Sequence, residues 1–153
     1  IKRGLPVVIC MIAPSSPNAK SPFPAHTLLD IYKKFIKTVK GIEDIYVFSN
    51  FNIITIGEEL SDKYNIKMLI CGADRGKDYK RITTNYAEEA HLDPGFELVV
   101  LDRPDDGDGI SATKVRKALE DGDYKSFEHM FIPYKPKECY EKLKSIYDDF
   151  LSR

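Results

Sequence analysis

The sequence has the length and composition of a single folded domain. It contains 153 residues, of which 42% are hydrophobic and 31% charged, and its net charge is -1 at pH 7. This balance excludes a disordered chain and a membrane-embedded one. With a near-neutral charge, no overall positive field recruits nucleic acid, so any anion must be bound by a local group of residues.

The predicted elements begin with the opening stretch IKRGLPVVICMIA. Its basic residues and Gly4 resemble the last turn and cap of a helix that leads into a strand. A natural start normally carries Met, so we expect the sequence to begin inside a structural element.

Four apolar runs of strand length follow one another along the chain, at residues 6–13, 44–49, 67–71 and 96–101. Helical patterns separate them, at residues 25–39, 58–64 and 77–90. Strands that are apolar on both faces and alternate with helices predict the α/β class, with a doubly wound parallel sheet covered on both sides. Ligands bind such sheets beyond the carboxyl ends of the strands.

Two loops at these strand ends carry candidate site residues. The loop PSSPNAKSPFPAH holds one lysine, Lys20, in an otherwise uncharged stretch, and is either a plain surface loop or part of an anion site. In the later loop CGADRGKDY, Gly72 lets the backbone turn and Asp74 is expected to cap the next helix. Capping alone would explain Asp74, and a nucleotide contact is the alternative. Arg75 and Lys77 either are solvated or face an anionic ligand.

The strongest pattern is GISATKVRKALEDGDY, at residues 109–124. Ser111 is a good N-cap and Thr113 lies in the first turn, so their hydroxyls and the free N–H groups form an anion site at the positive end of a helix. Lys114 and Arg116 are unfavourable to the helix dipole there, and a phosphate bound between them and the N–H groups removes the conflict. A capped helix with surface cations is the alternative.

Neighbouring residues are expected to have structural roles. Ile110 fits a hydrophobic staple onto Val115 and Leu119. The acidic loop DRPDDGDG, at residues 102–109, is more typical of a solvent-facing turn than of a cation site, so no metal site is assigned to the protein. Residues 132–153 predict an amphipathic helix that packs on the 1–131 domain or on a partner.

The cysteines, Cys10, Cys71 and Cys139, are odd in number and lack the spacing of a metal site. Cys10 and Cys71 lie inside apolar runs, which predicts buried, unpaired thiols. Reduced cysteines together with the absence of a signal peptide in this sequence favour a cytoplasmic protein.

Three motifs together resemble those of a known superfamily. ISATKVRKALEDGDYKSF is similar to the ISSTxxR motif of the HxGH-type adenylyl- and cytidylyltransferases. LICGADRGKDYKRI resembles the strand and glycine-aspartate turn that borders their nucleotide, and AKSPFPAH resembles the loop before the helix that follows their second strand. The order and intervals fit over residues 4–131. The nearest resemblance is to nicotinamide mononucleotide adenylyltransferase-like proteins, including phage-encoded ones.

The resemblance implies a Rossmann-like nucleotidyltransferase fold and a specific reaction. AMP, or CMP, would move from a nucleoside triphosphate to a phosphorylated acceptor such as nicotinamide mononucleotide, with release of pyrophosphate and with Mg²⁺ accompanying ATP or CTP. Residues at the start of the later helix would hold the triphosphate: Ser111, Thr113, Lys114 and Arg116. The nucleotide pocket would be lined by Gly72, Asp74 and Arg75, with Lys20 near the phosphates or the acceptor.

The HxGH signature itself is absent from this sequence, and His26, His91 and His129 do not fit it. We expect the first strand, the signature and most of a first helix, about 20 residues, to precede Ile1, so no catalytic residue is assigned. Leu28 stands near the place where relatives often carry an arginine, which leaves the acceptor open.

Two readings of the function therefore stand side by side. The first is an active nucleotidyltransferase, and the alternative is a non-catalytic viral or structural module that retains the fold without the HxGH site. In either case the expected partners are small molecules, with no nucleic acid and no membrane, and a homo-oligomer is left open. A phage-encoded protein would reside in the host cytoplasm or the virion.

Overall fold

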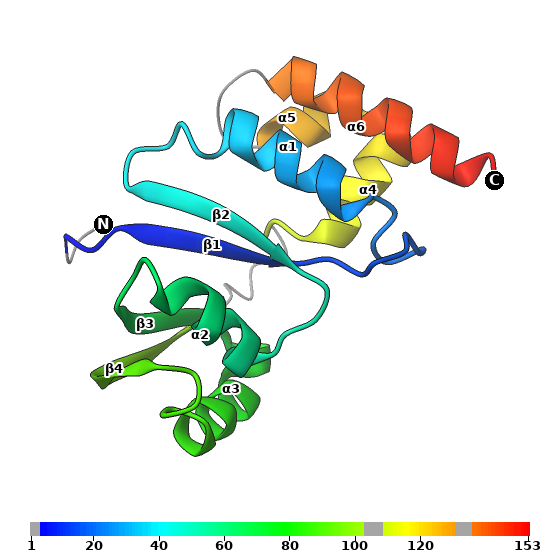
Figure 1. Cartoon of the computed structure of the whole chain (residues 1–153). Helices are drawn as coiled ribbons and strands as arrows, with labels where there is room; N and C mark the ends of the chain where they lie inside the picture. The colour runs from blue at the N-terminus through cyan, green and yellow to red at the C-terminus, as the bar shows by residue number, and fades with distance from the viewer. Residues whose placement is uncertain (1–3, 103–108, 131–135) are drawn as a thin grey trace. The chain divides into compact units, whose positions relative to one another are not determined.

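The computed structural model describes residues 4–102, 109–130 and 136–153 (Figure 1). The described chain is a mixed α/β structure whose strands are paired in parallel. It divides into two compact units. Unit 1 comprises residues 1–50 and 110–153, and unit 2 comprises residues 51–109.

Unit 1 opens with a strand-helix-strand element, whose parts are β1 (Val7–Ile12), α1 (Ala25–Phe35) and β2 (Ile42–Phe48). The two strands are parallel, so they need a crossover connection, which α1 supplies, and the register aligns Ile9 with Ile45. Gly4, just before β1, has a φ of 69°, the left-handed conformation that glycine adopts without strain.

The remaining helices of unit 1 are α4 (Ala112–Glu120), α5 (Tyr124–Met130) and α6 (Pro136–Leu151). These helices lie beside α1 (Figure 1). The four helices enclose one apolar core. Its buried members are Ile31, Phe35, Ala118, Leu119, Phe127, Cys139, Leu143 and Tyr147. The C-terminal helix α6 supplies three of these side chains, four residues apart, so that one face of α6 is buried in unit 1.

Unit 2 repeats the strand-helix-strand plan. Its elements are α2 (Ile53–Ser61), β3 (Ile66–Gly72), α3 (Ala73–Asn85) and β4 (Leu92–Leu101). After an irregular start, the parallel register runs without a break from Met68 opposite Glu97 to Gly72 opposite Leu101. The helix α2 lies very close to the backbone before β4, because a Cβ on Gly57 would stand 2.0 Å from the carbonyl oxygen of Ala90.

All four predicted strands are present and parallel within their pairs, which confirms the α/β class. Several boundaries differ from the prediction. The helix expected at 58–64 starts at Ile53, because the Asn52 side chain accepts the N–H groups of Ile54 and Thr55 and caps it there. The helix expected at 77–90 starts at Ala73 and ends at Asn85.

The prediction that Cys10 and Cys71 are buried is wrong. Both are half-buried, and Cys139 is the buried cysteine. Cys10 and Cys71 lie in two-stranded sheets, which are too narrow to bury the side chains on their faces. Cys139 lies on the inner face of α6, within the core of unit 1. Burial raises the pKa of the Cys139 thiol to about 11, with a smaller contribution from the charge of Glu138.

Within the described residues, none of the helices is both long enough and apolar enough to cross a bilayer. The acidic loop at 102–109 lies outside the described residues except at its two ends.

Candidate functional site

The N-terminus of α4 has the cap predicted from the sequence. Ser111 is the N-cap residue in an extended conformation, and its Oγ accepts a hydrogen bond from the backbone N–H of Lys114 at 3.2 Å. The first N–H groups of a helix have no partner within the helix, and together with the helix dipole they favour an anion. The cap therefore fixes where this positive end begins.

Arg116 connects this helix to the loop after β1. Its Nη1 donates a hydrogen bond to the carbonyl oxygen of Lys20 at 2.9 Å, and its Nη2 donates to Oγ1 of Thr113 at 3.3 Å. The structure thus brings together residues that are 96 positions apart. We call the five residues at this place the α4 cluster: Lys20, Ser111, Thr113, Lys114 and Arg116.

The opposite face of α4 anchors the cluster in unit 1. Ala118 is 4% exposed and Leu119 is fully buried, and Val115 packs against the same core. The predicted staple of Ile110 is wrong, since Ile110 is 56% exposed. The helix is held to the core by Val115, Ala118 and Leu119, which lie after its first turn. Its N-terminal turn therefore stays at the surface.

The other three predicted residues belong to unit 2, at the junction of β3 and α3. Gly72 is the N-cap of α3 and has no side chain to cap it, and Asp74 lies in the first turn. The prediction that Asp74 caps the helix is wrong, because Gly72 already occupies the cap position two residues earlier. A Cβ on Gly72 would stand 2.7 Å from Oδ1 of Asp74, so glycine is what permits the carboxylate to lie against the backbone here.

The charges of Asp74 and Arg75 act on two neighbouring side chains. Burial raises the pKa of the Cys71 thiol, and the Asp74 carboxylate raises it further. Burial also raises the pKa of Tyr79, an effect that the Arg75 guanidinium partly offsets. Cys71 is accordingly a thiol at neutral pH rather than an activated thiolate nucleophile.

Sequence reasoning missed an aromatic pair beside this junction. The rings of Phe51 and Tyr79 are stacked, with centroids 4.1 Å apart and planes at 13°. The two residues lie on either side of β3 in the chain, and no local pattern links them. Only the tertiary packing of unit 2 brings them together.

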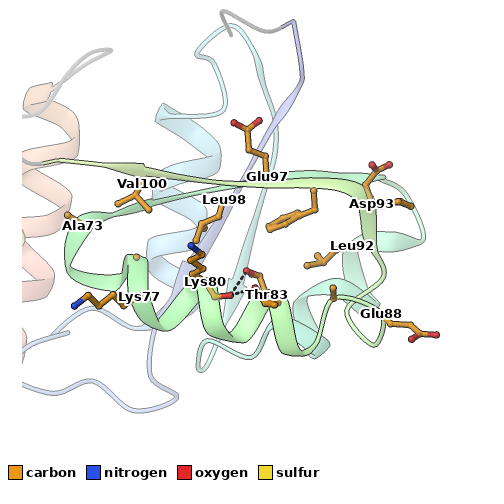
Figure 2. A pocket seen from close by; sticks show the side chains of 15 residues that line it. Ala73, Lys77, Lys80, Thr83, Glu88, Leu92, Asp93, Glu97, Leu98 and Val100 are labelled. Carbon is orange, nitrogen blue, oxygen red and sulfur yellow. Dashed lines mark hydrogen bonds between the residues drawn. The ribbon is translucent and has the colours of Figure 1, made fainter.

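A groove of about 1030 Å³ runs between α3 and β4 in unit 2 (Figure 2). Apolar side chains of β4, among them Leu98 and Val100, form one wall, and α3 contributes Lys77 and Lys80 to the other. The Thr83 hydroxyl in this groove donates to the carbonyl oxygens of Tyr79 and Lys80 within α3. The predicted residues Gly72, Asp74 and Arg75 do not line the groove.

In the part of the chain that the structure describes, His, Cys, Asp and Glu side chains form no group of three or more that could hold a metal ion. The chemistry available to the α4 cluster is that of hydrogen-bond donors and positive charge, which suits an anionic oxygen ligand.

The described fold defines the class of this protein as mixed α/β with parallel strand pairs. Beyond that class, comparison with known proteins gives no match: neither a family model, nor a curated protein, nor a solved structure is similar to the chain. The resemblance to nucleotidyltransferases therefore rests on the three sequence motifs.

Proposed function

We propose that the α4 cluster binds the triphosphate of ATP, or of CTP, and that the protein is a nucleotidyltransferase. The observation that carries this proposal is the placement of Arg116. Its guanidinium is held by the carbonyl of Lys20 and the hydroxyl of Thr113, beside the capped N-terminus of α4.

A bound phosphate would explain why two cations, Lys114 and Arg116, stand at the positive end of α4. Lys114 and Arg116 oppose the helix dipole when the site is empty, and a phosphate group between them and the first-turn N–H groups would be attracted by both. Arg116 has five N–H donors and uses two on Lys20 and Thr113 within the described residues. The remaining donors suffice for a forked pair of hydrogen bonds to phosphate oxygens.

The reaction proposed for the site is displacement at the α-phosphorus. An oxygen of the acceptor phosphate forms a bond to the α-phosphorus while the bond to the bridging oxygen breaks, and pyrophosphate leaves with the electron pair. Such a transfer is accelerated chiefly by holding the two phosphates in line and neutralising their charge. Ser111, Thr113, Lys114 and Arg116 would bind the departing phosphates, and Mg²⁺ would accompany the nucleotide.

The remaining predicted residues complete the proposal. Gly72, Asp74 and Arg75 would line the nucleotide pocket and Lys20 would lie near the phosphates or the acceptor. The acceptor class follows from the resemblance alone, with nicotinamide mononucleotide as the first compound to test.

The proposed fold is a doubly wound, Rossmann-like sheet with one strand more than the described residues supply. Two parallel strand-helix-strand elements, β1-α1-β2 and β3-α3-β4, support this proposal, because they are the units from which such sheets are built. Among the described residues each strand pairs with one neighbour, so each pair has open edges to which a further strand could add.

Calorimetric titration with ATP and Mg²⁺ tests the proposed binding. Loss of a charge-assisted hydrogen-bond partner costs about 1.5 to 3 kcal/mol, so Arg116→Ala should weaken binding roughly tenfold to a hundredfold. Arg116→Lys should not restore the affinity, because an ammonium group cannot make the forked contact.

Lys117→Ala is the matched control on the same helix. Lys117 pairs with Asp121 at 2.9 Å, and its removal changes the charge of α4 by the same amount without touching the cluster. Equal affinities of the wild type and Arg116→Ala would refute the assignment. Pyrophosphate release with nicotinamide mononucleotide as acceptor then distinguishes an enzyme from a module that binds nucleotide without turnover.

A further inference from the structure

The loop after β1 contains a tight turn that is closed by four hydrogen bonds. The backbone N–H of Asn18 donates to the carbonyl of Ser21 at 2.9 Å, and the N–H of Ser21 donates back at 3.0 Å. The side-chain Oδ1 of Asn18 accepts two more, from the N–H groups of Lys20 and Ser21, each at 3.0 Å. One side-chain oxygen thus holds two consecutive peptide groups.

These bonds determine the direction of the Lys20 carbonyl. The carbonyl of Lys20 and the N–H of Ser21 belong to one planar trans peptide group, so they point in opposite directions. Because the Ser21 N–H points at Asn18, the Lys20 carbonyl points away from it. That carbonyl is the acceptor for Nη1 of Arg116.

The turn is fixed at its far end as well. Pro22, the next residue, is among the fully buried side chains, and Phe23 packs against the core of unit 1 with its ring centroid 6.1 Å from that of Tyr147. A proline also restricts the backbone of the residue before it, here Ser21. The carbonyl that receives Arg116 is therefore held from both sides.

We infer that Asn18 is a positioning residue for Arg116. Its main-chain carbonyl and its Oδ1 both accept the Ser21 N–H, and Oδ1 also accepts the Lys20 N–H, so the side chain adds to the bonds that orient the Lys20 carbonyl. The carbonyl in turn orients the guanidinium for a triphosphate. This inference rests on the proposed function of the α4 cluster. It assigns an indirect role to the Asn18 side chain, whose Oδ1 accepts N–H groups of its own turn.

A double-mutant cycle separates this role from that of an ordinary surface turn. Asn18→Ala removes the Oδ1 acceptor and leaves the main-chain bonds of the turn. Calorimetric titration with Mg²⁺-ATP should show an affinity weakened roughly threefold to tenfold, in keeping with the loss of one or two neutral hydrogen bonds. In an Arg116→Ala background the same substitution should change the affinity less than about twofold, because the group being oriented is gone.

A second measurement does not depend on nucleotide. In the free protein, Asn18→Ala should shift the NMR signal of the Arg116 Nε–H group. Asn65→Ala is the control, since Asn65 donates to Asp93 at 2.6 Å in unit 2 and its loss should move neither this signal nor the affinity.

The outcomes distinguish the inference from the function on which it rests. If the wild type does not bind Mg²⁺-ATP, the proposed function fails and the role in triphosphate binding fails with it. If the wild type binds and Asn18→Ala is without effect, or its effect simply adds to that of Arg116→Ala, the positioning role is wrong while the binding site stands.

Discussion

The two units bury their apolar residues to different extents. In unit 1, four helices enclose a core in which Phe127, Leu119 and Cys139 are fully buried. Among the described residues unit 2 buries fewer apolar side chains, namely Ile53, Ile56, Leu60 and Ala90. On its paired strands Ile70 and Leu101 are 52% and 56% exposed, against 46% for Ile12 on β1 of unit 1. Parallel sheets are usually covered on both faces. The helices of unit 2 therefore cover only part of the apolar surface of its sheet.

This difference bears directly on the candidate site. The α4 cluster stands on a helix whose inner face is buried, so a substitution at its exposed first turns should change binding without unfolding the protein. Asp74 and Arg75 are exposed at the end of a less covered sheet, so substitutions there should also cost little stability, whereas a side chain at Gly72 would meet Oδ1 of Asp74. The comparison therefore predicts where stability and binding can be separated.

The largest loss of stability is expected for Phe127→Ala. Phe127 is 0% exposed and meets Tyr140 edge-on, with centroids 5.2 Å apart. Removing a buried ring of this size costs about 3 to 5 kcal/mol. Urea unfolding measures the loss, and Ile70→Ala in unit 2 is the comparison, expected to cost under about 1 kcal/mol. Similar losses for the two variants would contradict the contrast between the units.

Gly57→Ala should be the most damaging small substitution in unit 2. The new methyl group would stand 2.0 Å from the carbonyl oxygen of Ala90, and a backbone atom cannot move aside cheaply. We expect a cost of about 3 kcal/mol in thermal or urea unfolding. Gly109→Ala is the control, because a Cβ there meets nothing within 4 Å. A Gly57→Ala protein as stable as this control would show that α2 does not approach Ala90 so closely.

The core of unit 1 should weaken in alkaline solution through Cys139. Burial raises the pKa of its thiol from an ordinary value of 9.0 to about 11. This contribution to stability is fully present below pH 9 and is lost as the pH rises towards about 11, since the unfolded chain then releases a proton that the folded chain keeps. The loss is on the order of 2 kcal/mol.

Unfolding free energies across this pH range measure the effect, and Cys139→Ala is the control in which the tyrosines and lysines still titrate. The alkaline loss should be smaller in the variant than in the wild type. If the unfolding free energy falls equally with pH in the wild type and in Cys139→Ala, the Cys139 thiol is not desolvated.

A smaller loss is expected for Ser111→Ala, which removes the N-cap of α4. Caps of this kind contribute about 1 kcal/mol. Thermal unfolding compares it with Ser145→Ala on the exposed face of α6, which should be neutral. If the Ser111 variant is as stable as the Ser145 variant, the cap does not set the start of α4.

Local patterns in the sequence predict much of this structure. Apolar runs of strand length identify β1 to β4, and Ser111 followed by an apolar period of helical spacing identifies both the cap and the inner face of α4. These features depend on neighbours a few residues away. The Asn52 cap of α2 was within reach of the same reasoning, since asparagine before an apolar run is a start signal.

What the sequence does not reveal depends on contacts between distant residues. The bond from Arg116 to the Lys20 carbonyl and the stack of Phe51 on Tyr79 leave no local trace. The half-buried Cys10 and Cys71 show the same limit, because an apolar run indicates the tendency to be buried but not whether another element covers it. The role of Asn18 emerges only when the turn and α4 are seen together.

The central claim is that a triphosphate binds at the N-terminus of α4. A titration of isotopically labelled protein with Mg²⁺-ATP, followed by amide NMR signals, tests it most directly. Signals of the first α4 residues, Ala112 to Lys114, and the Nε–H of Arg116 should shift together and saturate, while those of the buried face of α6 should not. Saturable shifts confined to other residues, such as Lys77 and Lys80 of the groove in unit 2, would contradict the account.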